Sequence, residues 1–302
     1  MEICDDLFRQ NQIDMLKRKL KVSVISDLHL GTYGCQAKSI NKYLKSIDPE
    51  ILVLNGDIID IWQFSKSYWP DSHMKVAQRI FKMMANGTEV YYLTGNHDEM
   101  LRKFTNFQMG RLHLMNKLVL ELDGKKAWIF HGDVFDVTMK SSKWLAKLGA
   151  VGYDTLIILN SMVNWFSIKM GRGKLSFAQK VKSGVKSAIK FIDDFEQTAI
   201  DIASEKGFDY VICGHIHQPQ KKVVSTPKGF LTYLNSGDWI ENLTALEYNE
   251  GSWDIFYYDK WKNESESDMD FEEDEKDNKA AIDIQTVLNE ISKSVLTPAK
   301  VV

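Results

Sequence analysis

Short apolar runs alternate with helical periodicity along the first third of the chain. The apolar runs predict strands at KVSVIS (21–26), ILVL (51–54) and EVYYL (89–93), with helices between them at 36–47 and 73–85. This alternation is typical of βαβ units, in which helices join neighbouring parallel strands. We therefore predict an α/β fold built on a largely parallel sheet.

The rest of the chain divides into a helical stretch flanked by further strands. LVLEL (118–122) and AWIF (127–130) surround the turn signal Asp123-Gly124, and the pattern from about 137 to 206 is helical. Strand signals return at YVIC (210–213), KVV (222–224), FLTYL (230–234), LTALEY (243–248) and WDIFYY (253–258). The helical stretch is therefore predicted to be an insertion between strands.

The two ends of the chain fall outside this pattern. Residues 264–275 carry eight acidic side chains out of twelve, which is typical of a solvated linker. Beyond this run, Ile284, Val287, Leu288, Ile291 and Val295 recur at helical spacing. We predict an N-terminal extension (1–20), a main domain (21–262) with a helical cap at about 137–206, an acidic linker (263–279) and an amphipathic C-terminal helix (280–302).

Composition narrows the class of protein. The 302 residues are 44% hydrophobic and 26% charged, as in soluble globular proteins, and the net charge of −3 argues against a general nucleic-acid binder. The 3 cysteines show no CxxC spacing, which favours reduced thiols in the cytoplasm. No apolar signal segment and no membrane-spanning apolar run are evident. We expect a cytoplasmic protein that does not span a membrane.

Five polar clusters each follow a predicted strand. They are Ser26-Asp27-Leu28-His29, Asn55-Gly56-Asp57-Ile58-Ile59-Asp60, Gly95-Asn96-His97-Asp98, His131-Gly132-Asp133 and Gly214-His215-Ile216-His217. The carboxyl ends of strands in open α/β sheets form the ligand crevice, so all five can converge on one site. Taken singly, each cluster is also explained by helix capping, turn chemistry or a surface loop. Their joint occurrence favours a shared site.

The clusters are rich in metal-binding side chains. They contain five of the 7 histidines of the chain, and only His73 and His113 lie elsewhere, where a structural role is expected. Carboxylate and imidazole donors without cysteine suit Mn²⁺, Fe²⁺ or Zn²⁺. There are enough ligands for two ions with a shared carboxylate between them.

This set of motifs resembles the calcineurin-like metallophosphoesterase superfamily over about residues 21 to 260. The resemblance implies a four-layer αββα sandwich with a dimetal centre, in which the late strands at 222–258 belong to the second sheet. It also implies that Asp27, His29 and His217 hold one ion, that Asn96, His131 and His215 hold the other, and that Asp57 bridges them. In such enzymes water activated by the two divalent cations attacks phosphorus.

The same resemblance implies a catalytic pair beside the ions. His97 would face the scissile phosphate and stabilise charge or protonate the leaving oxygen, and Asp60 is the first candidate to orient it. Asp133, Asp136, Asn235 and Asp238 are candidates to support the metal loops.

The helical insertion is strongly cationic. From Met139 to Lys190 it carries ten Lys or Arg side chains against one acid, together with tryptophans. A cationic, tryptophan-bearing helical segment suits the surface of an anionic membrane and could also form a lid over the site. The alternative is an ordinary helical core with a solvated lysine face. Candidate substrate contacts are Arg102, Lys140, Trp144, Trp165, Lys169, Arg172 and Lys174.

Four segments carry a closer resemblance, to the UDP-2,3-diacylglucosamine pyrophosphatases of lipid A synthesis. They are SDLHLG (26–31), NGDIIDIW (55–62), HGD (131–133) with the insertion that follows, and NSGDWIEN (235–242). This resemblance implies a nucleotide-sugar lipid substrate, cleavage to UMP and 2,3-diacylglucosamine 1-phosphate, Mn²⁺ as the usual metal and peripheral association with the inner membrane. The chain departs from the best-known branch by carrying His97 where that branch has Arg.

Two other classes of function stay open on the sequence. One is a soluble phosphodiesterase, nuclease or phosphoprotein phosphatase of the same superfamily, although the Asp-Arg-Gly motif of the phosphoprotein phosphatases is missing after Asp57. A nuclease is disfavoured because the basic residues cluster with tryptophans in the insertion instead of tracking a phosphate groove. The other class is a non-catalytic scaffold, against which the complete ligand set argues.

Overall fold

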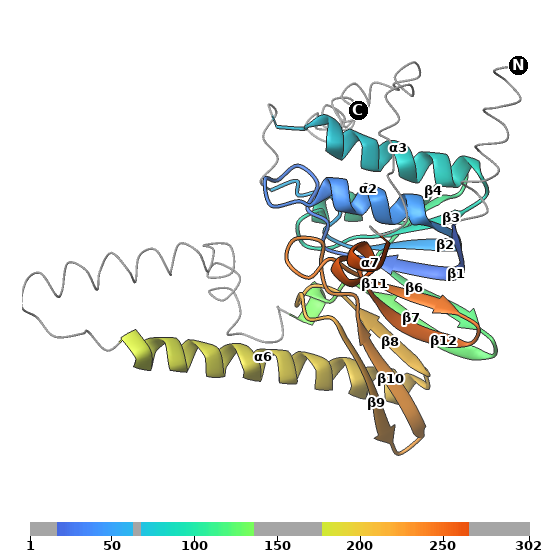
Figure 1. Cartoon of the computed structure of the whole chain (residues 1–302). Coiled ribbons are helices and arrows are strands. Elements are labelled where there is room, and N and C mark those ends of the chain that lie inside the picture. Colours follow the sequence, from blue (N-terminus) through green and yellow to red (C-terminus); the bar gives the residue numbers. More distant parts are fainter. Residues whose placement is uncertain (1–16, 63–67, 136–176, 266–302) are drawn as a thin grey trace, which may run out of the picture. The chain divides into compact units, whose positions relative to one another are not determined.

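The computed structural model describes residues 17–62, 68–135 and 177–265 of the chain (Figure 1). Most of the predicted N-terminal extension, the cap from 136 to 176, and the linker and C-terminal helix from 266 onward lie outside these residues. Residues up to Trp261 form one compact unit, which contains both sheets, and the chain from Lys262 belongs to a second unit. Only 262–265 of the second unit, the end of helix α7 (Tyr258–Ser265), are described.

The first sheet has seven strands and is mixed. Its order is β12-β11-β1-β2-β3-β5-β4, and its central strands β1, β2, β3 and β5 are parallel. The bounds are β1 (Arg18–Ile25), β2 (Ile47–Asn55), β3 (Glu89–Leu93), β4 (Phe107–Met109), β5 (Leu112–Met115), β11 (Thr244–Asn249) and β12 (Ser252–Tyr257). The parallel sheet predicted from the alternation of apolar runs is thus present, with antiparallel strands added at both edges.

The second sheet has five strands in the order β6-β7-β8-β10-β9. The bounds are β6 (Lys117–Leu122), β7 (Lys125–Phe130), β8 (Tyr210–Cys213), β9 (Gln220–Thr226) and β10 (Gly229–Asn235). Strands β7, β8 and β10 are parallel neighbours, whereas β6 and β9 pair antiparallel at the two edges.

The prediction that all late strands lie in the second sheet is wrong for two of them. β9 and β10 do lie there, but β11 pairs antiparallel with β1 of the first sheet, with Val22 opposite Tyr248, and β12 pairs with β11. β1 is buried along most of its length, and without β11 one of its edges would expose unpaired backbone groups. The partner comes from more than 200 residues away, so no local pattern indicates it.

Three layers of apolar packing build a four-layer αββα sandwich, which confirms the predicted fold class. Along β2 the side chains alternate: Leu52 and Leu54 pack with helices α2 (Ala37–Ser46) and α3 (Asp71–Ala85), and Val53 faces the second sheet. The space between the sheets is filled by Val22, Val24, Val53, Leu120, Ile129 and Ile212 among others. Helix α6 (Phe177–Lys206) covers the far face of the second sheet with Phe195 and Ala199 (Figure 1).

Helix α6 is the described part of the predicted helical cap, and no strand interrupts it. Its C-terminal half packs on β8 and β10. Among the described residues, no helix is long and apolar enough to cross a membrane.

Candidate metal centre

The five polar clusters meet where strands of both sheets end. The clusters follow β1, β2 and β3 of the first sheet and β7 and β8 of the second. Backbone hydrogen bonds join the loops: Asp27 N donates to Gly56 O at 3.0 Å, His29 N to Asp57 O at 2.9 Å, and Gly214 N to His131 O at 2.9 Å. The convergence expected from the carboxyl ends of strands is therefore present, although two sheets supply it instead of one.

A first group of donors consists of Asp27, His29 and His217. One ligand atom from each lies within 4.8 Å of the others, and His217 Nε2 is 3.1 Å from Asp27 Oδ1. These are the three side chains for which the superfamily resemblance implies one shared ion. The structure brings them together, and their role as ligands stays a prediction.

A second group consists of Asp57, His131 and His215, again with one ligand atom from each within 4.8 Å of the others. His131 Nε2 lies 3.2 Å from Asp57 Oδ2, and His131 Nδ1 lies 2.9 Å from the carbonyl oxygen of Asn55. That contact makes Nδ1 the protonated nitrogen, because a carbonyl only accepts, and it leaves the Nε2 lone pair available to a cation.

The buried polar atoms of the two groups fit divalent cations. Within the described part of the chain, His29 Nε2 and Asn96 Oδ1 are buried and have no hydrogen-bond partner. A buried polar atom left without a partner costs about 1–3 kcal/mol, so a ligand that supplies the missing interaction is expected here. Nitrogen and oxygen donors without sulfur match Mn²⁺, Fe²⁺ or Zn²⁺, as expected from the sequence.

The carboxyl groups stay ionised despite their burial. Burial alone would raise the pKa of Asp27, but His217 and His131 outweigh it and hold that pKa below the usual value. The pKa of Asp57 lies well below its usual range, because His131 and His29 outweigh the effect of burial. Burial lowers the pKa of His217, but Asp27 dominates and raises it to about 9. Cations would replace the protons that these imidazoles otherwise hold.

The backbone of the site is unusual. Asp27, His29, Asp57, His215 and His217, five of the seven predicted ligands, have positive φ angles between 48° and 68°. Residues other than glycine adopt this left-handed region seldom, and such strain gathers at functional sites.

Two glycines let the loops approach closely. A Cβ atom on Gly56, which has a φ of +81°, would lie 2.3 Å from His131 Nδ1. A Cβ on Gly95 would lie 2.2 Å from Asp57 Oδ1. Only glycine leaves room for the two side chains on which the second donor group depends.

Asp60 contacts two histidines. Its Oδ2 is 2.8 Å from His97 Nδ1 and 3.3 Å from His29 Nδ1, and the carboxyl is almost completely buried. Burial would lower the pKa of His97, but Asp60 and Asp57 raise it above the usual value, which favours a protonated ring. The contact with His97 is the one that the resemblance implies. The contact with His29 adds a carboxylate behind a predicted metal ligand.

The supporting residues were only partly indicated by the sequence. Asn235 Nδ2 donates to Gly214 O at 2.9 Å, which places this candidate behind the Gly-His-x-His loop as expected. Asn242 Nδ2 donates to His217 O at 2.9 Å, a contact that we did not predict. The exposed Trp62 ring lies 4.9 Å from the His97 ring. Asn242 lies in the NSGDWIEN segment and Trp62 in the NGDIIDIW segment. The sequence therefore singled out both segments but did not indicate these two contacts.

Arg102 is the one candidate substrate contact that the structure describes. Its guanidinium forms an ion pair with Asp133. The other candidates, Lys140, Trp144, Trp165, Lys169, Arg172 and Lys174, and the supporting candidate Asp136 lie outside the described residues. Both remaining histidines have structural contacts: His73 Nδ1 accepts from Gly31 N, and His113 contacts Glu89.

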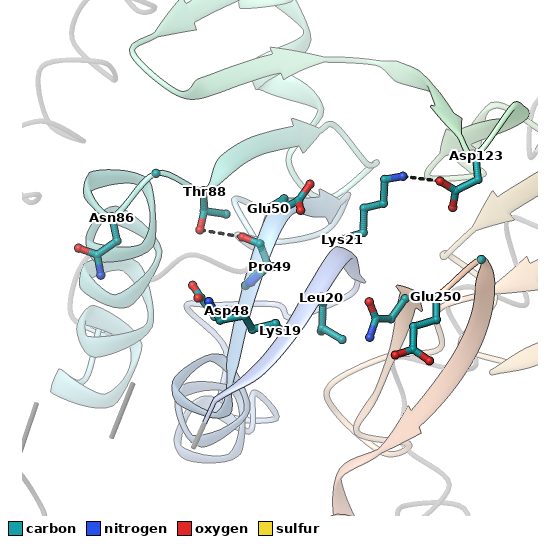
Figure 2. A pocket seen from close by; sticks show the side chains of 13 residues that line it. Lys19, Leu20, Lys21, Asp48, Pro49, Glu50, Asn86, Thr88, Asp123 and Glu250 are labelled. Atoms are coloured by element: carbon teal, nitrogen blue, oxygen red, sulfur yellow. Dashed lines mark hydrogen bonds and ion pairs between the residues drawn. The ribbon is translucent and has the colours of Figure 1, made fainter. Parts of the chain in front are cut away.

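A hollow of about 510 Å³ lies at the end of the strands opposite the donor groups (Figure 2). Its lining includes the first residues of β1 and β2 and the Asn86–Thr88 segment before β3. Lys21 and Asp123 form an ion pair across it, 2.7 Å from Nζ to Oδ1. None of the predicted ligand or catalytic residues lines this hollow; they all follow the carboxyl ends of the strands.

Comparison with known proteins identifies the family of this chain. Residues 20–219 match the family described as "Calcineurin-like phosphoesterase". The chain belongs to this family, and it is therefore a metallophosphoesterase, a hydrolase that uses divalent metal ions.

Two relatives with the same name align with most of this chain. A protein of Aliivibrio fischeri named "UDP-2,3-diacylglucosamine hydrolase" is 24% identical, and the alignment covers 76% of this chain and 95% of the relative. A protein of Stenotrophomonas maltophilia with the same name is 22% identical, over 76% and 96%. Among solved structures, a "Novel Archaeal Phosphodiesterase" aligns over 78% of this chain and 98% of its own, with 13% identity and a TM-score of 0.37.

Proposed function

We propose that this enzyme hydrolyses the pyrophosphate bond of UDP-2,3-diacylglucosamine and releases UMP and 2,3-diacylglucosamine 1-phosphate, a step of lipid A synthesis. The observation that carries the proposal is the pair of donor groups, Asp27-His29-His217 and Asp57-His131-His215, assembled within one family fold. The names of relatives that align over nearly their whole length support this substrate.

The roles of the ligands follow the two groups. Asp27, His29 and His217 would hold one divalent ion, and His131, His215 and Asn96 the other, with Asp57 shared between them. Mn²⁺ is the metal proposed, and Fe²⁺ and Zn²⁺ suit the same donors. When bound, such a pair of cations activates water and neutralises phosphoryl oxygens.

In this proposal His97 donates a proton to the leaving phosphate oxygen, and Asp60 orients His97. Asp60 Oδ2 lies 2.8 Å from His97 Nδ1, and the carboxylate favours the protonated form of the ring. Nε2 can then hold a proton for the leaving phosphate oxygen. A positioned general acid of this kind contributes about 10²- to 10⁴-fold to the rate.

The proposal includes the place where the enzyme works. The cationic stretch from Met139 to Lys190 would bring it to the cytoplasmic face of the inner membrane, where lipid substrates reside. Lys140, Trp144, Trp165, Lys169, Arg172 and Lys174 would contact the lipid or the membrane surface.

Product analysis tests the substrate and the attacked atom together. The Mn²⁺-loaded enzyme is incubated with UDP-2,3-diacylglucosamine in ¹⁸O-labelled water, and mass spectrometry identifies the products. We expect UMP and the acylated sugar phosphate, with the label in one of them. Hydrolysis of a chromogenic phosphodiester without cleavage of the UDP-lipid would instead support a different phosphodiesterase.

Variants separate the catalytic pair from the scaffold. His97→Ala and Asp60→Asn are expected to lower kcat by about 10²-fold or more while metal is still bound by the remaining ligands. His113→Gln is the matched control, because that histidine contacts Glu89 away from the donor groups.

In the insertion, Trp165→Ala and Lys169→Ala should raise KM for the lipid but not for the chromogenic diester. Equal losses on both substrates would argue against a lipid-binding cap.

A further inference from the structure

A small cavity lies beside the second donor group. Its volume is about 150 Å³, and its walls include His131 itself and Phe130, Asp133, Thr94, Arg102 and Asn116. These residues come from the ends of β3 and β7, from the turn between β5 and β6, and from the 3-10 turns η1 (Glu99–Phe104) and η2 (Asp133–Phe135). Both sheets therefore form its walls.

The polar groups of the cavity are mutually ordered. Thr94 Oγ1 donates to Asn116 Oδ1 at 2.8 Å, and Arg102 Nε donates to Thr94 Oγ1 at 3.4 Å. The Arg102 guanidinium is paired with the nearly buried Asp133 carboxylate. This network fixes the direction of donors and acceptors before any ligand binds.

The charge of the cavity decides what kind of group fits it. Arg102 is the only Arg or Lys in the lining and Asp133 neutralises it, so a phosphate is expected at the cations beside His131 and not at these walls. The cavity does offer hydrogen-bond donors from Arg102 and Asn116, and acceptors from Asp133 and Asn116. A neutral group with both carbonyl oxygens and an N–H is complementary to this lining.

The size of the cavity excludes the lipid part of the proposed substrate. Sites for drug-sized ligands measure about 300–1,000 Å³, so 150 Å³ admits one ring but no acyl chain. Phe130 and Val134 also line the cavity, and they offer an apolar surface to one face of a planar ring. Of the three parts of a UDP-linked lipid, the pyrophosphate belongs at the cations and the acylated sugar needs apolar surroundings. The nucleoside remains.

We propose that the cavity formed by Thr94, Arg102, Asn116 and Asp133 binds the uracil ring of the substrate. This inference rests on the proposed function, and it assigns the nucleotide half of the substrate to the His131 side of the metal centre. Specificity for uracil arises because another base would present a different order of donors and acceptors to the same fixed network.

Binding of UMP tests the assignment without the lipid. Isothermal titration calorimetry on the full Mn²⁺-loaded chain compares UMP with CMP, which changes one carbonyl and one N–H of the ring, and with ribose 5-phosphate, which lacks the ring. We expect UMP to bind about 10-fold more tightly than either. Asn116→Ala should remove this preference and leave the affinity for ribose 5-phosphate unchanged, since the wall loses one ring contact while the phosphate still meets the cations.

The controls keep the outcomes separate. Asn116 is exposed, so its replacement should not impair folding, and Gln108→Ala, on edge strand β4 outside the cavity, should leave all three affinities unchanged. Thr94→Val provides a second variant of the same wall. Equal affinities for UMP and ribose 5-phosphate, or a UMP preference that survives both variants, would overturn the assignment.

The proposed function can fail independently. If UMP shows the Asn116-dependent preference but UDP-2,3-diacylglucosamine is not cleaved, the cavity binds uracil and the enzyme acts on another uridine nucleotide. If the lipid is cleaved while Asn116→Ala leaves both KM and UMP affinity unaltered, the function stands and the uracil site is refuted.

Discussion

Asp98 offers the sharpest test of how the site is held together. Its carboxylate is fully buried and accepts three hydrogen bonds, from Gly95 N at 2.6 Å, Ile58 N at 3.0 Å and the Tyr92 hydroxyl at 2.7 Å. Ile58 follows the predicted bridging ligand Asp57, and Gly95 precedes Asn96. One side chain therefore joins the loop after β2 to the loop after β3. We predict that Asp98→Asn weakens both the fold and metal binding.

The magnitude follows from the contacts. An asparagine oxygen in the place of Oδ2 can still accept from Ile58 N and Tyr92, but its amide nitrogen then faces the Gly95 N–H as donor against donor. Loss of one hydrogen bond to a charged acceptor costs about 1.5–3 kcal/mol, so Asp98→Asn should cost about 2–3 kcal/mol. Tyr92→Phe removes one donor and leaves the other two bonds, and it should cost about 1 kcal/mol.

Urea unfolding with excess EDTA measures these losses on the fold alone. Manganese titration of the same variants measures the effect on the ligands, and Asp98→Asn should weaken binding about 10-fold or more. Tyr91→Phe is the matched control, since the Tyr91 ring stacks on His113 away from the donor groups. If Asp98→Asn unfolds within 0.5 kcal/mol of the unaltered chain, about the scatter of neutral surface substitutions, the carboxylate does not organise the loops.

Three further predictions concern packing and metal. Gly56→Ala should abolish stoichiometric binding of the metal ion held by the His131 group, because the added Cβ would displace His131; elemental analysis measures the loss. Gly124→Ala is the control, since Gly124 has a similar φ of +78° but open space around it, and this variant should retain both metal ions. Phe195→Ala should lower the unfolding free energy in urea by about 3–5 kcal/mol, because this fully buried ring packs beside Gly132 and Phe135. Removing divalent ions with EDTA should lower Tm, and metal at 100 times Kd should restore about 2.7 kcal/mol; an unchanged Tm would contradict metal binding by the folded state.

The individual elements were predictable because their signals are local. Apolar runs gave the positions of β1, β2, β3, β7 and β8, and the polar cluster after each of them was visible in the sequence. The short strands β4 and β5 were missed, since three exposed residues and four mostly half-buried residues carry no clear alternation. The sheet to which β11 and β12 belong was predicted wrongly, because strand pairing across the whole chain leaves no local trace.

The site divides in the same way. Motifs indicated which side chains gather, but not how they are held. The second contact of Asp60 with His29 and the bond from Asn242 to the His217 carbonyl join loops that are distant in sequence. The cavity beside His131 was equally invisible, because Thr94, Arg102 and Asn116 meet only after both sheets have formed. Such networks are properties of the assembled loops.

The strained backbone gives this assembly a physical consequence. Left-handed conformations of residues other than glycine cost about 1–2 kcal/mol each, so the five ligand positions with positive φ need external support. Much of that support comes from other ligand loops: Asp27 N and His29 N donate to the loop after β2, and His215 N donates to Asp27 Oδ2 at 3.2 Å. Each ligand loop thus helps to hold the backbone of a neighbouring ligand loop in its strained conformation. A change at one loop should therefore weaken ligands contributed by its neighbours, and the donor groups should form together, not one side chain at a time.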